Sequence, residues 1–181
     1  HSFPLTLQHD SMQCGIACLQ MICKYFGRDY TLSALSKHCF ATTEGVSLLG
    51  ISEAADTLGL HTLSARATVD ELAENPLPAI LHWNQNHFVV LYRIKKGKIC
   101  YIADPGKGLV TYDDREFKEH WLSTRSNGEE KGMKGSKAIA ENPALHSEYQ
   151  NINALLCFAE QYEVMKNEII QTGRFGLDGK V

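Results

Sequence analysis

The sequence predicts an α+β fold, in which a helical first third packs on an antiparallel sheet and a helical extension follows at the C-terminus. Apolar residues recur at helical spacing as far as residue 58, and short strand-like segments replace them between residues 61 and 112. Helical spacing returns only after a polar, glycine-rich stretch over 126–137. The chain has 181 residues, of which 44% are hydrophobic and 22% charged, as expected for one globular domain with an appendage.

Three helices are expected in the first third, over residues 14–26, 32–38 and 45–58. Gly27 and Gly59 follow the first and the third of them, and glycine commonly ends a helix. Thr31 precedes the second helix, where its hydroxyl can cap the first turn. The helical part of the fold is therefore expected to end near residue 59.

The middle of the chain is expected to form the sheet, with strands over 61–67, 78–83, 88–94, 99–103 and 108–112. A short helix over 68–74 is expected to begin with a capping box, because Thr68 is followed three residues later by Glu71. Another short helix is expected over 114–121.

Residues 95–98 are typical of a hairpin connection between the third and fourth of these strands. If the two strands pair in an antiparallel manner, the start of the first lies opposite the end of the second. His87 and Asp104 are therefore expected to lie near each other at one edge of the sheet.

We expect three regions: a domain over 1–127, a linker over 128–144 and an amphipathic helical tail over 145–181. Apolar residues of the tail share one helical face, namely Ile152, Leu155, Leu156, Ala159, Tyr162, Met165 and Ile169. Because such a face is costly to leave in water, it is expected to dock on the domain, on a partner or on a neighbouring copy, the last giving self-association.

The bulk composition excludes several classes of function. A net charge of −3 gives no electrostatic reason to expect binding to nucleic acid or to an anionic membrane surface. No run of about 18 apolar residues predicts a transmembrane segment. Six cysteines without a CxxC pair or a secretory signal favour reduced, mostly buried thiols and no metal site. The chain begins with His1, so we expect it to be processed, tagged or excised from something larger.

The strongest chemical signal is Cys14, which opens the first expected helix six residues after Gln8. A helix N-terminus favours a thiolate, and a nearby imidazolium favours it further. The small neighbours Gly15 and Ala17 leave room for a substrate backbone near the sulfur. The alternative is a buried structural cysteine, which we expect for the other five.

His87 is the candidate base, since it begins an apolar strand from which its ring can reach a cleft. Asp104 can accept the ring N–H and hold the tautomer, and it also starts a turn. Gln8 can donate its side-chain amide to an oxyanion, together with the backbone N–H of Cys14. The competing histidines are His61, His82 and His120. Nucleophile, base, orienting carboxylate and oxyanion donor together predict a thiol hydrolase.

The sequence resembles the C39 peptidases, the papain-like, bacteriocin-processing domains of peptidase-containing ABC transporters. The resemblance covers roughly residues 3–127 and depends on segments in a fixed order: Gln8…Cys14-Gly15-x-Ala17-Cys18-Leu19, Gly45-Val46-Ser47, Trp83-Asn84-x-x-His87-Phe88-Val89-Val90-Leu91 and Asp104-Pro105-x-x-Gly108. Two departures stand out. Gln13 occupies a position that is commonly acidic in this family, and beyond Gly132 the similarity stops, so residues 133–181 are either a native extension or fused sequence.

The resemblance implies a cytosolic cysteine peptidase that cleaves a leader peptide after Gly-Gly, coupled to export of the cargo. It makes Cys14 the nucleophile, His87 the base, Asp104 the orienting group and Gln8 the oxyanion donor. The implied partners are the leader and the transmembrane and nucleotide-binding domains of a transporter, at the inner face of the cell membrane. No cofactor is implied, and this chain has no G-x-x-x-x-G-K-[ST] loop for ATP.

Two other functions are open at this point. A related module can bind a secretion substrate without cutting it, although such relatives lack the nucleophile that Cys14 provides here. Alternatively, the same catalytic groups can transfer the acyl group to an amine instead of water. The sequence does not distinguish the acceptor.

Overall fold

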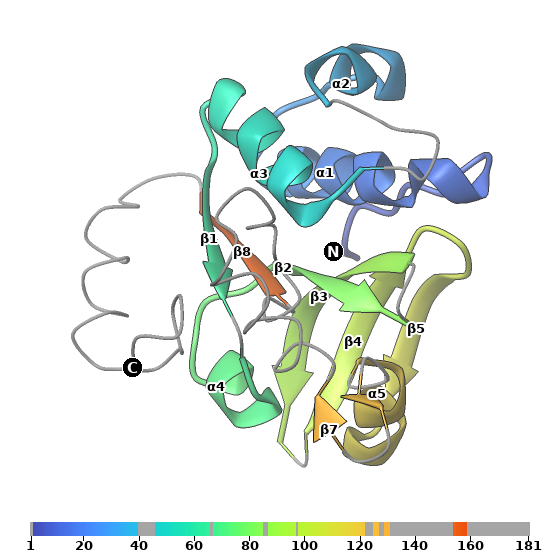
Figure 1. The fold of residues 1–181 in the computed structure, drawn as a ribbon, viewed down its shortest axis with the longest axis vertical. Helices are drawn as coiled ribbons and strands as arrows, with labels where there is room; N and C mark the ends of the chain where they lie inside the picture. Colours follow the sequence, from blue (N-terminus) through green and yellow to red (C-terminus); the bar gives the residue numbers. More distant parts are fainter. Residues whose placement is uncertain are drawn as a thin grey trace.

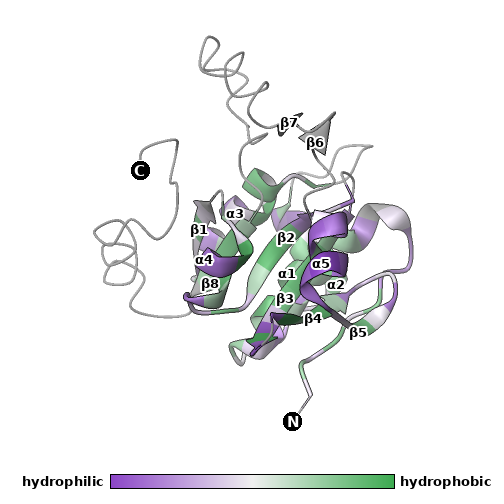
Figure 2. Cartoon of the chain, turned by 90° about the horizontal axis from the view of Figure 1, so that it is seen from below, coloured by the Kyte–Doolittle hydropathy of each residue, from purple (hydrophilic) through white to green (hydrophobic). Residues whose placement is uncertain are grey.

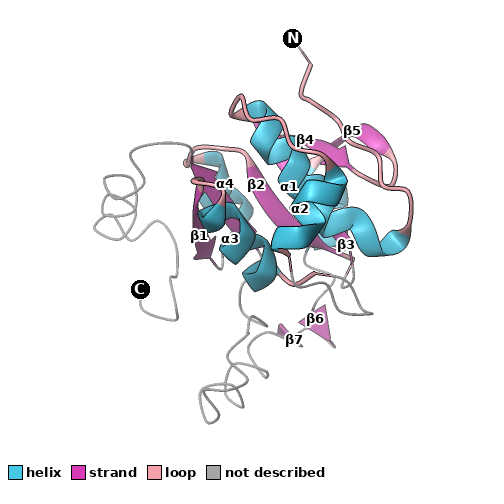
Figure 3. Cartoon of the chain, turned by 90° about the horizontal axis from the view of Figure 1, so that it is seen from above, coloured by secondary structure: helices cyan, strands magenta, loops and turns pink. Residues whose placement is uncertain are grey.

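The computed structural model of the chain describes residues 2–39, 46–65, 67–84, 87–96, 98–121, 125–126, 129–130 and 154–158. Within these residues a six-stranded sheet separates two groups of helices (Figure 1). One face is covered by α1 (Cys14–Tyr25), α2 (Leu32–His38) and α3 (Leu48–Thr57), which are seen in front of the sheet in Figure 3. The other face is covered by α4 (Val69–Ala73) and α5 (Asp114–Trp121).

The helices form where the sequence predicts them because the residues that cap them lie next to them in the chain. Thr31 and Ser47 accept backbone N–H groups at the starts of α2 and α3, and Thr68 forms a capping box with Glu71 at the start of α4. A short 3-10 turn, η1 (Ser11–Gln13), leads into α1, whose N-cap makes no side-chain hydrogen bond. The first ten residues of α1 are all buried, so this helix forms the centre of one layer.

The sheet has the strand order β1-β8-β2-β3-β4-β5, and every neighbouring pair is antiparallel. Its strands are β1 (His61–Ala65), β2 (Ala79–Trp83), β3 (His87–Lys95), β4 (Ile99–Asp104), β5 (Gly108–Tyr112) and β8 (Ala154–Phe158). All but the last lie where we predicted strands. A separate two-stranded ladder joins β6 (Arg125–Ser126) and β7 (Glu129–Glu130).

Strand β8 corrects the expected domain boundary and the expected tail helix. Residues 154–158 form a strand between β1 and β2, so the sheet of the domain includes residues well beyond 127 (Figure 1). The chain runs from β1 through α4 to β2, but these two strands are not neighbours in the sheet. Strand β8 lies between them and is antiparallel to both, so β1 and β2 run parallel to each other. The remaining residues of the expected linker and tail, apart from β7, lie outside the described residues.

The two faces of the sheet bury two separate cores. Leu155 and Cys157 of β8 belong to the core beneath α1–α3, whereas Ala154 and Leu156 belong to the core beneath α4 and α5. Figure 2 shows hydrophobic strands between helices that carry hydrophilic residues. Since Leu155 and Leu156 are buried inside the sheet, they are not available for the docking surface that we expected of the tail.

Candidate active site

His87 and Asp104 meet at one end of the β3–β4 hairpin, as the predicted pairing requires. The Nε2–H of His87 donates to Oδ1 of Asp104 at 2.7 Å. The same carboxylate oxygen accepts the backbone N–H of Gly106 at 2.8 Å. Asp104 is only 2% exposed, so its charge is balanced by these donors instead of by bulk water. The turn at Asp104 therefore also holds the carboxylate in place.

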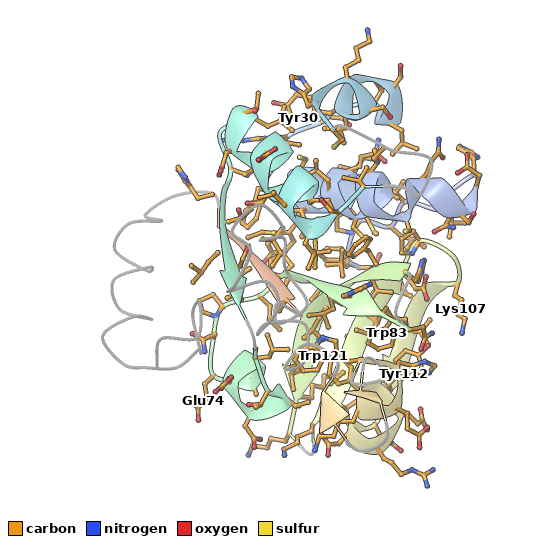
Figure 4. All side chains as sticks on the ribbon, in the orientation of Figure 1. Tyr30, Glu74, Trp83, Lys107, Tyr112 and Trp121 are labelled. Carbon is orange, nitrogen blue, oxygen red and sulfur yellow. The ribbon has the colours of Figure 1, made fainter. Side chains whose placement is uncertain are left out.

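The electrostatics of this pair favour the charged form of both groups. Burial lowers the pKa of His87, but hydrogen bonds to Asp104 and Cys14 and the negative charges of both groups raise it to about 9. Burial alone would raise the pKa of Asp104, but hydrogen bonds from His87 and Gly106 and the positive charges of His87 and Lys107 lower it below its ordinary value. Lys107 lies on the turn between β4 and β5 (Figure 4).

Cys14 occupies the first position of α1 and interacts with the ring of His87. Because Nε2 of His87 is bonded to Asp104, Nδ1 is the ring nitrogen left for the sulfur. Cys14 is 5% exposed. The five other cysteines are also buried, as predicted, and all six are free thiols.

Gly15 explains how the helix reaches the sheet. A Cβ atom at Gly15 would lie 3.1 Å from Cδ1 of Ile51 and 3.5 Å from Cδ2 of Phe88. Since Gly15 follows Cys14 and Phe88 follows His87, this close approach brings the preceding residues of the two elements together. The distance to Ile51 of α3 is tighter than an ordinary contact, whereas that to Phe88 of β3 is an ordinary van der Waals distance, so a side chain at position 15 would press first on α3.

Gln8 lies on the segment that leads into η1, and its backbone is fixed to the turn after Asp104. Its N–H donates to the carbonyl oxygen of Pro105 at 2.8 Å. The side-chain Oε1 of Gln8 is buried without a hydrogen-bond partner among the described residues. The side chain of Gln13 accepts the N–H of His9 at 3.3 Å, so the unusual residue before Cys14 closes the loop between Gln8 and α1.

The competing histidines lie elsewhere in the sheet and in α5. His61 pairs with Phe158 across β1 and β8, and His82 stacks on Phe88 with ring centroids 5.3 Å apart. His120 stacks on Trp83 at 5.1 Å, and its Nδ1 shares a hydrogen bond with Oδ1 of Asn84. His87, not these three, is bonded to the buried carboxylate.

An aromatic cluster supports the His87 end of β3. Trp83 is the register partner of His87 and lies 5.6 Å from Tyr112 and 5.4 Å from Phe117, measured between ring centroids. Figure 4 shows Trp83 and Tyr112 together near Trp121, on the side that α5 covers. No sequence feature predicts this support beyond the apolar character of the strand and the helix.

Within the described part of the chain, no helix is long and apolar enough to cross a membrane. Likewise, no group of three or more His, Cys, Asp or Glu residues among the described ones is placed to hold a metal ion.

Comparison with known proteins places the chain in a family. Residues 2–125 match the Peptidase C39 family. The chain belongs to this family. Two Escherichia coli relatives, the probable microcin-H47 secretion/processing ATP-binding protein MchF and the colicin V secretion/processing ATP-binding protein CvaB, are each 37% identical. The matches cover 58% and 62% of this chain but only 15% and 16% of the relatives.

Solved structures of C39 domains have the same fold. The double glycine motif protease of an AMS/PCAT transporter, solved in complex with its leader peptide, is 34% identical with a TM-score of 0.63. That match covers 66% of this chain and 86% of the other. The peptidase domain of Streptococcus ComA has a TM-score of 0.67 and is 21% identical, covering 88% of this chain and all of the other, a likeness of fold alone. The helical layer on an antiparallel sheet that we predicted is confirmed.

Proposed function

We propose that this C39 domain is a cysteine peptidase that cleaves the leader of an exported peptide after a Gly-Gly pair. The observation that carries the proposal is the position of His87, whose ring interacts with both the Cys14 thiol and the buried Asp104 carboxylate. A base held between a nucleophile and an orienting carboxylate is the arrangement that thiol hydrolases need.

In the proposed reaction, the sulfur of Cys14 gives its proton to His87 and attacks the carbonyl carbon of the second glycine. Asp104 holds the ring through Nε2 so that Nδ1 stays directed at the sulfur. The negative oxygen of the tetrahedral intermediate accepts the backbone N–H of Cys14 and the side-chain amide N–H of Gln8. The imidazolium then protonates the leaving amine as the C–N bond breaks, which leaves a thioester on Cys14.

Water completes the cycle. His87 takes a proton from the attacking water, which displaces the Cys14 sulfur and releases the leader with a free carboxylate. The raised pKa of His87, about 9, supports the first half of this sequence, because a ring that has taken the Cys14 proton keeps it near neutral pH until it gives it to the leaving amine.

The comparisons support the proposed substrate and partners. One structural relative is named as a double glycine motif protease bound to a leader peptide, and the curated relatives are named as secretion/processing ATP-binding proteins. The matched region is about a sixth of the length of those relatives. We therefore propose that the domain works with transmembrane and nucleotide-binding domains of an ABC transporter, on the cytoplasmic side of the membrane.

The test is incubation of the chain with a peptide that carries an amphipathic leader ending in Gly-Gly, followed by mass spectrometry. Two products that correspond to cleavage after the second glycine, absent with Cys14→Ala, support the proposal. Binding of the intact peptide without cleavage would instead support a binding module. A product extended by an added amine, at the expense of the hydrolysed one, would indicate acyl transfer.

A further inference from the structure

The segment before Gln8 is anchored to both the sheet and α1. Phe3 stacks on Tyr92 with ring centroids 4.6 Å apart, and the hydroxyl of Thr6 donates to Oε1 of Gln20 at 2.7 Å. The Gln8 N–H then bonds to Pro105, as described above. The segment is thus held at its start, in its middle and at the position of Gln8.

Gln20 is the unusual member of this set because it is a polar residue in the buried face of α1. It is 8% exposed, yet both ends of its amide are satisfied. Its Nε2 donates to the carbonyl oxygen of Tyr30 at 2.7 Å, and its Oε1 accepts the Thr6 hydroxyl. A carbonyl oxygen can only accept, so Tyr30 fixes which end of the amide faces Thr6, and Thr6 must be the donor.

We propose that Gln20 is a positioning residue for Gln8, acting through Thr6. This inference rests on the proposed function, in which the Gln8 amide stabilises the oxyanion. Gln20 and Cys14 are six residues apart on one helix, about 9 Å along its axis. Thr6 is two residues before Gln8, so the chain between them spans at most about 7 Å. A single helix therefore carries the nucleophile and, through one hydrogen bond, helps to hold the segment that carries the oxyanion donor, together with the Gln8–Pro105 hydrogen bond.

The hydrogen bond matters for rate because oxyanion stabilisation depends steeply on geometry. A donor contributes fully only when it lies at hydrogen-bond distance from the place where the negative oxygen forms, and small displacements of catalytic groups cost large factors in rate. Releasing Thr6 loosens the segment that carries Gln8 but leaves Cys14, His87 and Asp104 in place.

The experiment measures kcat and KM for the Gly-Gly peptide in Gln20→Leu, Thr6→Val and Thr6→Ser, each alone and combined with Gln8→Ala. Gln8→Ala is expected to lower kcat by roughly 10²-fold. Gln20→Leu and Thr6→Val are expected to lower kcat by about tenfold with little change in KM, since the oxyanion forms only after the substrate has bound. Thr6→Ser keeps the hydroxyl and is expected to restore the rate.

The decisive result is the combination with Gln8→Ala. If Gln20 and Thr6 act through Gln8, their substitution lowers kcat by less than about twofold once the Gln8 amide is gone. Thr62→Val is the matched control, because Thr62 is a buried threonine whose hydroxyl shares a hydrogen bond with Ser52 between β1 and α3, away from the site. It is expected to lower the unfolding midpoint without lowering kcat.

The outcomes distinguish failure of this inference from failure of the proposed function. The inference is overturned if Thr6→Val and Gln20→Leu lower kcat equally with and without the Gln8 amide, or no more than Thr62→Val does. If Gln20→Leu fails to fold, Thr6→Val alone decides, since it leaves the bond from Gln20 to Tyr30 intact. A normal kcat in Gln8→Ala would instead reject the role of Gln8, and cleavage by Cys14→Ala would reject the proposed function itself.

Discussion

Cys14 and Cys18 lie one turn apart on α1, and both are buried, yet their surroundings differ. Cys14 interacts with the ring of His87 at the start of β3. Cys18 is fully enclosed in the core beneath α1–α3. Burial raises the pKa of the Cys18 thiol well above its ordinary value, and electrostatic interactions with Cys14, Asp104 and Cys157 raise it further.

The comparison shows that neither residue type nor burial distinguishes these thiols. The difference is the imidazole–carboxylate pair, which the β3–β4 hairpin supplies at the first turn of α1 and not at the second. A thiol without a nearby cation keeps its proton and acts as a small apolar side chain. Four experiments test whether this difference decides the chemistry.

Removal of the first thiol has the largest expected effect. Cys14→Ala is expected to lower the rate of Gly-Gly cleavage by a factor on the order of 10⁴ or more, because no other group can form the thioester. Cys18→Ala is the matched control and is expected to keep the rate within a few-fold. Equal losses in the two variants, measured by mass spectrometry of the products, would break the comparison.

Removal of β8 tests the protection of the second thiol. Cys18 and Cys157 of β8 belong to the same core, so a chain truncated at residue 128 loses one wall of that core. Alkylation of Cys18 by iodoacetamide is expected to accelerate by roughly 10³-fold or more, as for a residue released from a folded core. The readout is peptide mapping after timed alkylation. An unchanged rate would mean that the domain folds without β8.

Neutralising the carboxylate tests the support of the imidazole. Asp104→Asn is expected to lower kcat by roughly 10²-fold or more, because the amide can present N–H to Nε2 and so favour the wrong tautomer. The matched control is Asp113→Asn, an exposed residue that caps α5, where asparagine serves equally well. Steady-state kinetics of both variants should differ by this factor, and a near-normal kcat for Asp104→Asn would contradict the role of the carboxylate.

The pH dependence gives the smallest effect. Activity is expected to fall as pH rises through about 9, where His87 loses its proton. This alkaline limb of the pH–activity profile reports the titration of Cys14 and His87 together, because the two groups interact. The pKa of His87 is raised in the folded state, so its contribution to stability is complete below about 6.5 and disappears as pH rises through about 9.

Asp104 has the opposite sign. Its pKa is lowered on folding, so its contribution is present above the unfolded value and is lost as pH falls through the lower folded value. Urea unfolding at a series of pH values checks both directions, with Asp104→Asn as the comparison. A flat stability profile between pH 6.5 and 9 would show that His87 is not held as described.

The sequence by itself determined the elements as far as Trp121, because caps, turns and periodicity are local. It also determined that His87 and Asp104 meet, since a short hairpin connection fixes which strand ends lie opposite each other. The start of α1 at Cys14, which puts the thiol on the first turn, was predicted from the apolar residues at helical spacing that follow it.

Only the tertiary structure decided the fate of residues 154–158. Their apolar run fits one face of a helix and also a strand buried on both sides, and periodicity cannot separate the two. The position between β1 and β2 requires a strand that pairs with both, and residues 154–158 form that strand. The approach of Cys14 to His87 was predicted from the residue types and the family resemblance, not from local pattern, and the bond from Thr6 to Gln20 was not predicted. Both join segments far apart in the chain through the packing of α1 on the sheet.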